Sequence, residues 1–238
     1  MKVFATLVAG IGLLGLVPLS AQDSWEDKRE REQGRKVLME FSKCAAKNNP
    51  ELARRYVLLE SGERLSSEEW QQLVDPACMR LRAGKLTMDQ FYFRGALAQQ
   101  LQSTDETDWQ ASNFTEVAPF KWETPVVPEQ GNLSDEAYAM IIAAHGEKHD
   151  EFTRQIFVKW VGECIARANP SGVRSVLVTR IDSKEERGAM QALGQNIVAC
   201  VPAGNKVAIN RTNLRTGLAI AYFRLADARV SAVGGVPN

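Results

Sequence analysis

Apolar residues recur at steps of three and four along much of the chain, which is the period of an α-helix. The clearest stripe lies in the second half and contains Ile156, Phe157, Trp160, Val161, Cys164, Ile165 and Ala168. A weaker stripe in the first half contains Val37, Phe41, Cys44 and Ala45. An Asn-Pro pair follows each stripe. Because the residue before a proline is disfavoured in a helix, both helices are expected to end there.

Signals for the start of a helix follow in both halves. Proline is well suited to open a helix, so short helices are predicted at 51–59 and 172–179. Ser66-x-x-Glu69 and Ser183-x-x-Glu186 have the spacing of a capping box, in which serine and glutamate satisfy free backbone N–H groups. An apolar stripe then runs from Trp70 to Leu81.

The last predicted helices cover 90–102 and 211–226, each preceded by an Ala-Gly turn and an Asp or Asn cap. No segment alternates apolar and polar residues for long enough to predict a strand, apart from a brief extended stretch at 207–209. The sequence therefore predicts an all-α fold.

The chain matches itself when it is shifted by 120 residues. This shift pairs Cys44 with Cys164, and Asn49-Pro50 with Asn169-Pro170. After a small gap the offset becomes 121, which pairs Arg94 with Arg215 and Leu97-Ala98 with Leu218-Ala219. The common order predicts two tandem pseudo-repeats of about four short helices each, with the matching parts at about 36–102 and 156–225.

Residues 103–133 separate the two expected copies, and their composition predicts an acidic linker. From 103 to 150 there are 10 acidic and 2 basic residues. A solvated, disordered linker is one interpretation. Aromatic residues favour a partly ordered linker that packs into grooves of a copy: Trp109, Phe114, Phe120 and Trp122. Ser134 then predicts the start of a helix that runs towards residue 145 and breaks near Gly146. The expected organisation is 22–102, 103–133 and 134–238.

The first 21 residues have the layout of a secretory signal peptide. Lys2 precedes an apolar run over 3–19, and small Ala21 stands before polar Gln22. The alternative is an uncleaved anchor, for which 17 apolar residues are at the short end. Cleavage would leave a chain without a stable membrane span, in the periplasm or outside the cell.

The expected oxidation state of the four cysteines depends on whether the chain is exported or cytosolic. An even number of cysteines in an oxidising compartment predicts disulfides. If the ancestral single copy paired its own two cysteines, the bridges are Cys44–Cys78 and Cys164–Cys200. Four reduced buried thiols are the alternative, and zinc is disfavoured because no cysteines have C-x-x-C spacing.

Composition and charge exclude several classes of protein. The apolar, charged, glycine and proline contents are ordinary, which argues against fibrous, wholly disordered and polytopic membrane proteins. With 29 basic and 29 acidic side chains, the charge balance gives no basis for nucleic acid as a partner.

His145 and His149 are the two histidines of the chain, and their spacing places them on one helix face. Two imidazoles near a carboxylate are a potential zinc or copper site. The motif is H-x-E-x-H, however, and lacks the H-E-x-x-H order of a zinc protease. Solvated surface histidines are therefore the preferred interpretation, and no metal or other cofactor is predicted.

Other catalytic motifs are missing from the sequence, which contains no G-x-S-x-G and no glycine-rich phosphate loop. Arg94 and Arg215 occupy equivalent positions, each between a large apolar residue and a small pair. They predict either a paired anion site or, preferably, a duplicated structural arginine that bonds to loop carbonyls.

The repeated pattern resembles a known family. Each copy contains an aromatic or valine three residues before Cys, an Asn-Pro stop, a capping box, a second Cys, an Ala-Gly turn with Lys, and an Arg-x-x-Leu-Ala helix. This is similar to signal-peptide-bearing, two-copy helical proteins of alphaproteobacteria. The resemblance implies an envelope location in a Gram-negative cell and carries over no functional residues.

The sequence thus predicts an exported, disulfide-bonded helical protein that is a non-catalytic binding or scaffolding module of the cell envelope. Its partner is an envelope component or a small ligand. The alternative is a metal-dependent enzyme or metal carrier that uses His145 and His149.

Overall fold

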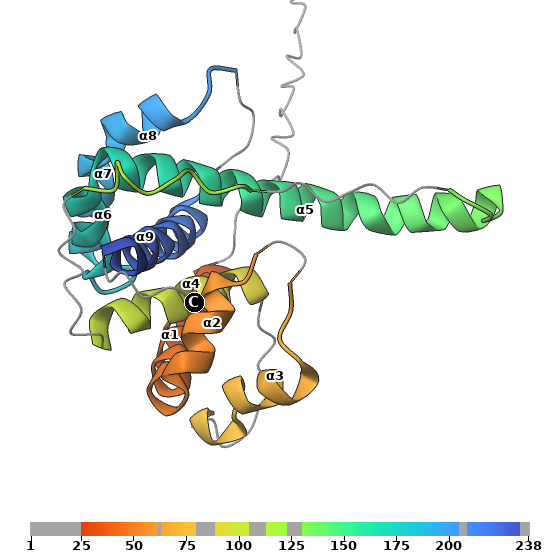
Figure 1. The fold of residues 1–238 in the computed structure, drawn as a ribbon, viewed down its shortest axis with the longest axis horizontal. Coiled ribbons are helices and arrows are strands. Elements are labelled where there is room, and N and C mark those ends of the chain that lie inside the picture. The colour runs from red at the N-terminus through yellow and green to blue at the C-terminus, as the bar shows by residue number, and fades with distance from the viewer. Residues whose placement is uncertain are drawn as a thin grey trace, which may run out of the picture.

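The computed structural model describes residues 25–60, 63–79, 89–104, 113–122, 130–204 and 209–233. Within these ranges the chain forms ten helices, counting one 3-10 helix, and no strand (Figure 1). The predicted all-α class is confirmed. None of the helices in these ranges is both long enough and apolar enough to cross a membrane. The predicted signal peptide, 1–21, lies outside the described residues.

The first half contains α1 (Trp25–Asn48), α2 (Pro50–Leu58), α3 (Ser67–Leu73), the 3-10 helix η1 (Pro76–Cys78) and α4 (Gln90–Thr104). The predicted stop at Asn49-Pro50 separates α1 from α2. The capping box at Ser66 and Glu69 is formed in both directions. The described part of the predicted apolar stripe, 70–79, does not form one helix, because Pro76 lacks the N–H that the helix ladder needs.

The second half contains α5 (Asp135–Ala168), α6 (Pro170–Leu177), α7 (Lys184–Ala192), α8 (Gly194–Cys200) and α9 (Arg211–Val233). The expected break at Gly146 is wrong, because α5 is one helix of 34 residues. A glycine costs a helix only about 1 kcal/mol and keeps its N–H donor, whereas a proline removes it. The amino-terminal part of α5 extends away from the other helices (Figure 1), and Met140 there is 74% exposed.

The helices α4, α5 and α9 form the centre of the molecule, where α9 packs against both α4 and α5. Small residues allow these close crossings. A Cβ on Gly217 of α9 would lie 2.5 Å from the Val158 carbonyl oxygen of α5, and a Cβ on Gly95 of α4 would lie 2.6 Å from Thr216 Cγ2 of α9. The largest fully buried apolar side chains around these crossings include Phe93, Leu97, Leu218, Tyr222 and Phe223.

Two disulfides join the ends of helices that are distant in sequence. Cys44 of α1 is bonded to Cys78 of η1, and Cys164 of α5 is bonded to Cys200 of α8. These are the two pairs expected from the two-copy interpretation of the sequence. Each bridge closes a loop of similar length, with sequence separations of 34 and 36 residues.

The segment 113–122 lies against α5 and α9. Phe114 is fully buried and meets the ring of Tyr222 edge-on. Arg167 of α5 donates hydrogen bonds to the carbonyl oxygens of Phe114, Val117 and Ala118. The Arg167 guanidinium therefore satisfies three backbone acceptors of a segment that forms neither helix nor strand.

Candidate functional site

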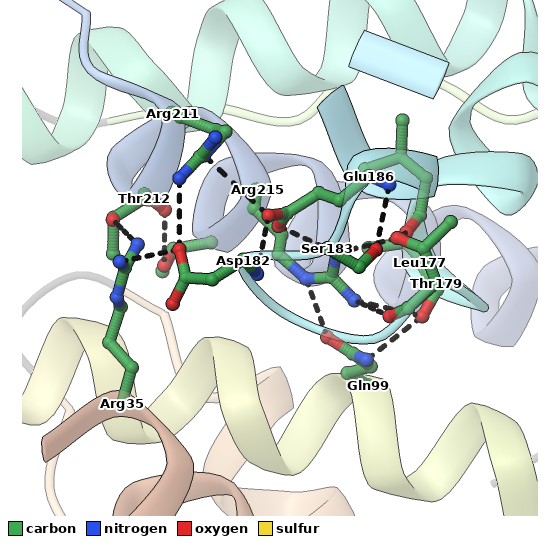
Figure 2. Close-up of polar contacts among 12 residues, drawn as sticks. Arg35, Gln99, Leu177, Thr179, Asp182, Ser183, Glu186, Arg211, Thr212 and Arg215 are labelled. Carbon is green, nitrogen blue, oxygen red and sulfur yellow. Dashed lines mark hydrogen bonds and ion pairs between the residues drawn. The ribbon is translucent and has the colours of Figure 1, made fainter. Parts of the chain in front are cut away.

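Arg215 is surrounded by acceptors in the second half of the chain (Figure 2). Its Nη1 lies 2.8 Å from Glu186 Oε1, and the guanidinium also donates to the carbonyl oxygens of Leu177 and Thr179 and to Gln99 Oε1. Burial lowers the pKa of Arg215, and the negative charge of Glu186 opposes that effect. The charge of Arg215 is thus neutralised within the protein.

The neighbouring cations in Figure 2 also have carboxylate partners. Asp182 Oδ1 lies 2.6 Å from Arg35 Nη2 and 2.9 Å from Arg211 Nη2. The second predicted capping box is only half formed, since Ser183 Oγ accepts from the Glu186 N–H but the Glu186 carboxylate accepts from the Asp182 N–H. The Glu186 carboxylate also forms ion pairs with Arg215 and Arg211, which both belong to α9.

Arg94, the counterpart of Arg215 in the first half, has a different environment. Its guanidinium lies 4.9 Å from the centre of the Tyr56 ring, and its Nη1 donates to the Leu59 carbonyl oxygen at 3.2 Å. Among the described residues, no carboxylate lies within ion-pair distance of Arg94. Glu69, which has the position of Glu186, pairs with Arg55 instead. Burial lowers the pKa of Arg94 as well.

Arg94 lies in a pocket between the two halves of the chain, lined by Leu59, Glu60, Arg94, Lys121, Trp122, Lys159, Ile220 and Arg224. We call this set the basic pocket. Four of its eight residues are basic and one is acidic. The loop after α2, the helices α4, α5 and α9 and the segment 113–122 all contribute to it.

Lys159 is the most buried cation of the basic pocket, with 8% of its surface exposed. Its ammonium nitrogen contacts the rings of Trp122 and Phe152 at 5.8 and 5.9 Å from their centres. No described residue accepts a hydrogen bond from it or pairs with it. Burial, together with the charges of Arg94 and Arg224, lowers the pKa of Lys159 to about 8.

Arg224 is a further, partly buried cation of the basic pocket. Its Nη1 donates to the carbonyl oxygens of Leu58 and Leu59, each at 3.2 Å. Its nearest carboxylate, Glu60, lies 3.7 Å from Nη2 and is 73% exposed. The Nε of Arg224 is buried without a hydrogen-bond partner. Burial is the main cause that lowers the pKa of Arg224.

Glu163 of α5 positions the aromatic wall of the basic pocket. It accepts from the Trp122 indole N–H at 2.7 Å and from the Phe120 backbone N–H at 3.1 Å. Arg167 also donates to Glu163, at 2.8 and 2.9 Å. The negative charge of Glu163 is therefore shared with Arg167 and does not form an ion pair with Lys159.

The other residues considered from the sequence do not join this pocket. The four cysteines are consumed in disulfides. His145 and His149 belong to α5, but their side chains are outside the described residues. No group of three metal-ligating side chains occurs among the residues that the structure describes.

Lys159 and Arg224 are pocket residues that no motif in the sequence indicates. Both interrupt apolar stretches, Phe157-Val158-Lys159-Trp160-Val161 and Tyr222-Phe223-Arg224-Leu225. A charged residue at a core-facing helix position could have indicated both residues, since charged groups are seldom buried without a partner.

No protein-family profile, curated protein or solved structure matches this chain.

Proposed function

We propose that this protein is a non-catalytic binding protein of the cell envelope, and that the basic pocket holds an anionic group of its ligand or partner. The observation that supports this is the contrast between two equivalent arginines. Arg215 has Glu186 at 2.8 Å, whereas Arg94 lies near two further cations, Lys159 and Arg224, and has no ion-pair partner among the described carboxylates. Buried positive charges are costly unless an anion accompanies them.

The chemistry of the pocket lining fits binding better than catalysis. Its polar groups are guanidinium, ammonium and one exposed carboxylate, and its walls are Leu59, Ile220 and Trp122. Such a set neutralises charge and excludes water. The lining contains no serine, threonine, cysteine or histidine, and its one carboxylate, Glu60, is 73% exposed, so the nucleophile and base pairs of common hydrolases are not found in this lining.

Export is part of this proposal. The signal-like residues 1–21 and the two disulfides together support a periplasmic or secreted protein. Intact-mass analysis of protein from the native host should find a chain shortened by about 20 residues, as signal removal requires. Full-length protein in the membrane fraction would contradict the proposal of a cleaved signal.

We further propose that the fold arose by duplication, with the copies at 22–102 and 134–238 and a linker at 103–133. Two contacts support it. The Tyr92 hydroxyl donates to Asn213 Oδ1 at 2.6 Å, and Gly95 is in contact with Thr216. Both pairs are 121 residues apart, which is the offset between the copies. Equivalent residues touch one another when two copies pack about a twofold axis.

The basic pocket would then be a place where the two copies have diverged.

Titration calorimetry of the mature protein against acetate, citrate, phosphate and sulfate at constant ionic strength tests the proposed function. We expect saturable binding of at least one anion, weakened about tenfold or more in Arg94→Gln. Arg55→Gln removes an equal charge outside the pocket and should leave affinity unchanged. Absence of binding by every anion would contradict the proposal.

A further inference from the structure

The charges around the basic pocket do not balance. Three of its cations come from three helices: Arg94 of α4 and Arg224 of α9 are partly buried, and Lys159 of α5 is buried. Within the lining, Glu60 supplies one negative charge, and it is largely exposed. Two positive charges are left without a counterion in the lining.

Other charged groups near the pocket do not remove this excess. Glu163 is paired with Arg167. Glu63, on the exposed loop after α2, attracts Arg94 and Arg224 without forming an ion pair with either. Lys121 at the pocket adds a further positive charge. With Lys121 included, the lining has four basic residues and one acidic residue, so the pocket favours a ligand group with at least two negative charges.

The placement of the donors suggests the shape of that group. The three cations belong to three different helices, so a ligand group between them would meet donors of three separate side chains. A carboxylate has two oxygens in one plane and suits a single guanidinium fork. A tetrahedral group has three or more oxygens that point apart, and each can accept from a different cation.

We propose that the basic pocket binds a tetrahedral dianion, the phosphoryl or sulfuryl group of its ligand. This inference rests on the proposed function and narrows it to one ligand class. A dianion would stabilise the ammonium of Lys159, which is repelled by the charges of Arg94 and Arg224. Lys121 and Glu60 line the same pocket, and Glu163, one turn further along α5, is paired with Arg167. Affinity should therefore fall as the pH rises above about 8, where the free protein loses the proton of Lys159.

Calorimetry with sulfate and perchlorate tests whether the pocket prefers a dianion, because both ions are tetrahedral and only sulfate carries two charges. Comparing perchlorate with acetate, a planar monoanion, tests the preference for a tetrahedral shape. At constant ionic strength and neutral pH, we expect sulfate to bind the mature protein at least about tenfold more tightly than either monoanion. Inorganic phosphate and glycerol 3-phosphate are then compared to identify the type of ligand. Higher affinity for the ester indicates a phosphorylated ligand, and higher affinity for the inorganic ion indicates free phosphate.

Lys159→Met locates the binding, because methionine fills the same buried space without charge and should fold. We expect it to lower sulfate affinity about tenfold and to abolish the decline in affinity above pH 8. Arg55→Gln should bind sulfate as the unmodified protein does. If acetate binds as tightly as sulfate, and Arg94→Gln weakens both, the dianion inference is overturned and the proposed function stands. If no anion binds, both are overturned.

Discussion

Arg215 of α9 and Glu186 of α7 form a buried ion pair, with 2.8 Å between Nη1 and Oε1 and at most 6% of either side chain exposed. This pair links the last helix of the chain to the α6–α7 loop region, because the same guanidinium bonds to the Leu177 and Thr179 carbonyls. A buried charge without its partner is strongly destabilising. The pair therefore has consequences for stability that can be measured.

Glu186→Gln should lower the free energy of unfolding by about 3 kcal/mol, because it leaves Arg215 charged and buried. Urea unfolding followed by circular dichroism measures this. Glu69→Gln is the matched control, since Glu69 has the equivalent capping position but pairs with Arg55 at the surface. It should cause a much smaller change. Equal losses of unfolding free energy in the two variants would contradict the prediction that the buried Arg215–Glu186 pair contributes more than the surface pair.

The unmodified protein should become more stable relative to Lys159→Met as the pH rises from 7.5 to 9.5. The pKa of Lys159 is about 8 in the fold and 10.5 in the unfolded chain. Between these values the unfolded chain binds more protons, so deprotonation favours the folded state. The gain should be about 2 kcal/mol over this range, from 1.36 kcal/mol per pKa unit. A constant difference between the two proteins would contradict this prediction.

Loss of either disulfide should destabilise the protein by about 3–4 kcal/mol, on the entropy of closing loops of this length. The variants are Cys44→Ala/Cys78→Ala and Cys164→Ala/Cys200→Ala, measured by urea unfolding. Peptide mapping without reductant on protein from the native host checks the pairing itself. A bridge between Cys44 and Cys164 would be incompatible with the two-copy proposal.

Gly217→Ala should destabilise the protein by about 1–3 kcal/mol, because the new methyl group would meet the Val158 backbone oxygen. Backbone atoms cannot rotate away, so α5 and α9 would have to separate. Gly188→Ala in α7 is the control, since a Cβ there meets nothing within 4 Å. It should stabilise the protein by up to about 1 kcal/mol through helix propensity. Thermal melts distinguish the two directions.

Local features were readable from the sequence because their causes are local. The Asn-Pro stops and the Ser66 capping box depend on residues a few positions apart, and each forms as predicted. The half-formed box at Ser183 shows where this reasoning fails. Glu186 has the right spacing for a reciprocal cap, yet Arg215 and Arg211 approach from α9 and bind its carboxylate.

The sequence by itself determined the helical class, the helix boundaries at the two Asn-Pro pairs and the cysteine pairing, since helix periodicity, proline and the self-match are properties of order along the chain. Only the tertiary structure decided the environments of Arg94 and Arg215, which are indistinguishable in the pattern. Arg215 meets Glu186 across α7 and α9, whereas Arg94 meets Lys159 and Arg224 from helices of the other half. The balance of charge in a buried site depends on distances between distant segments, so it is set when the helices pack.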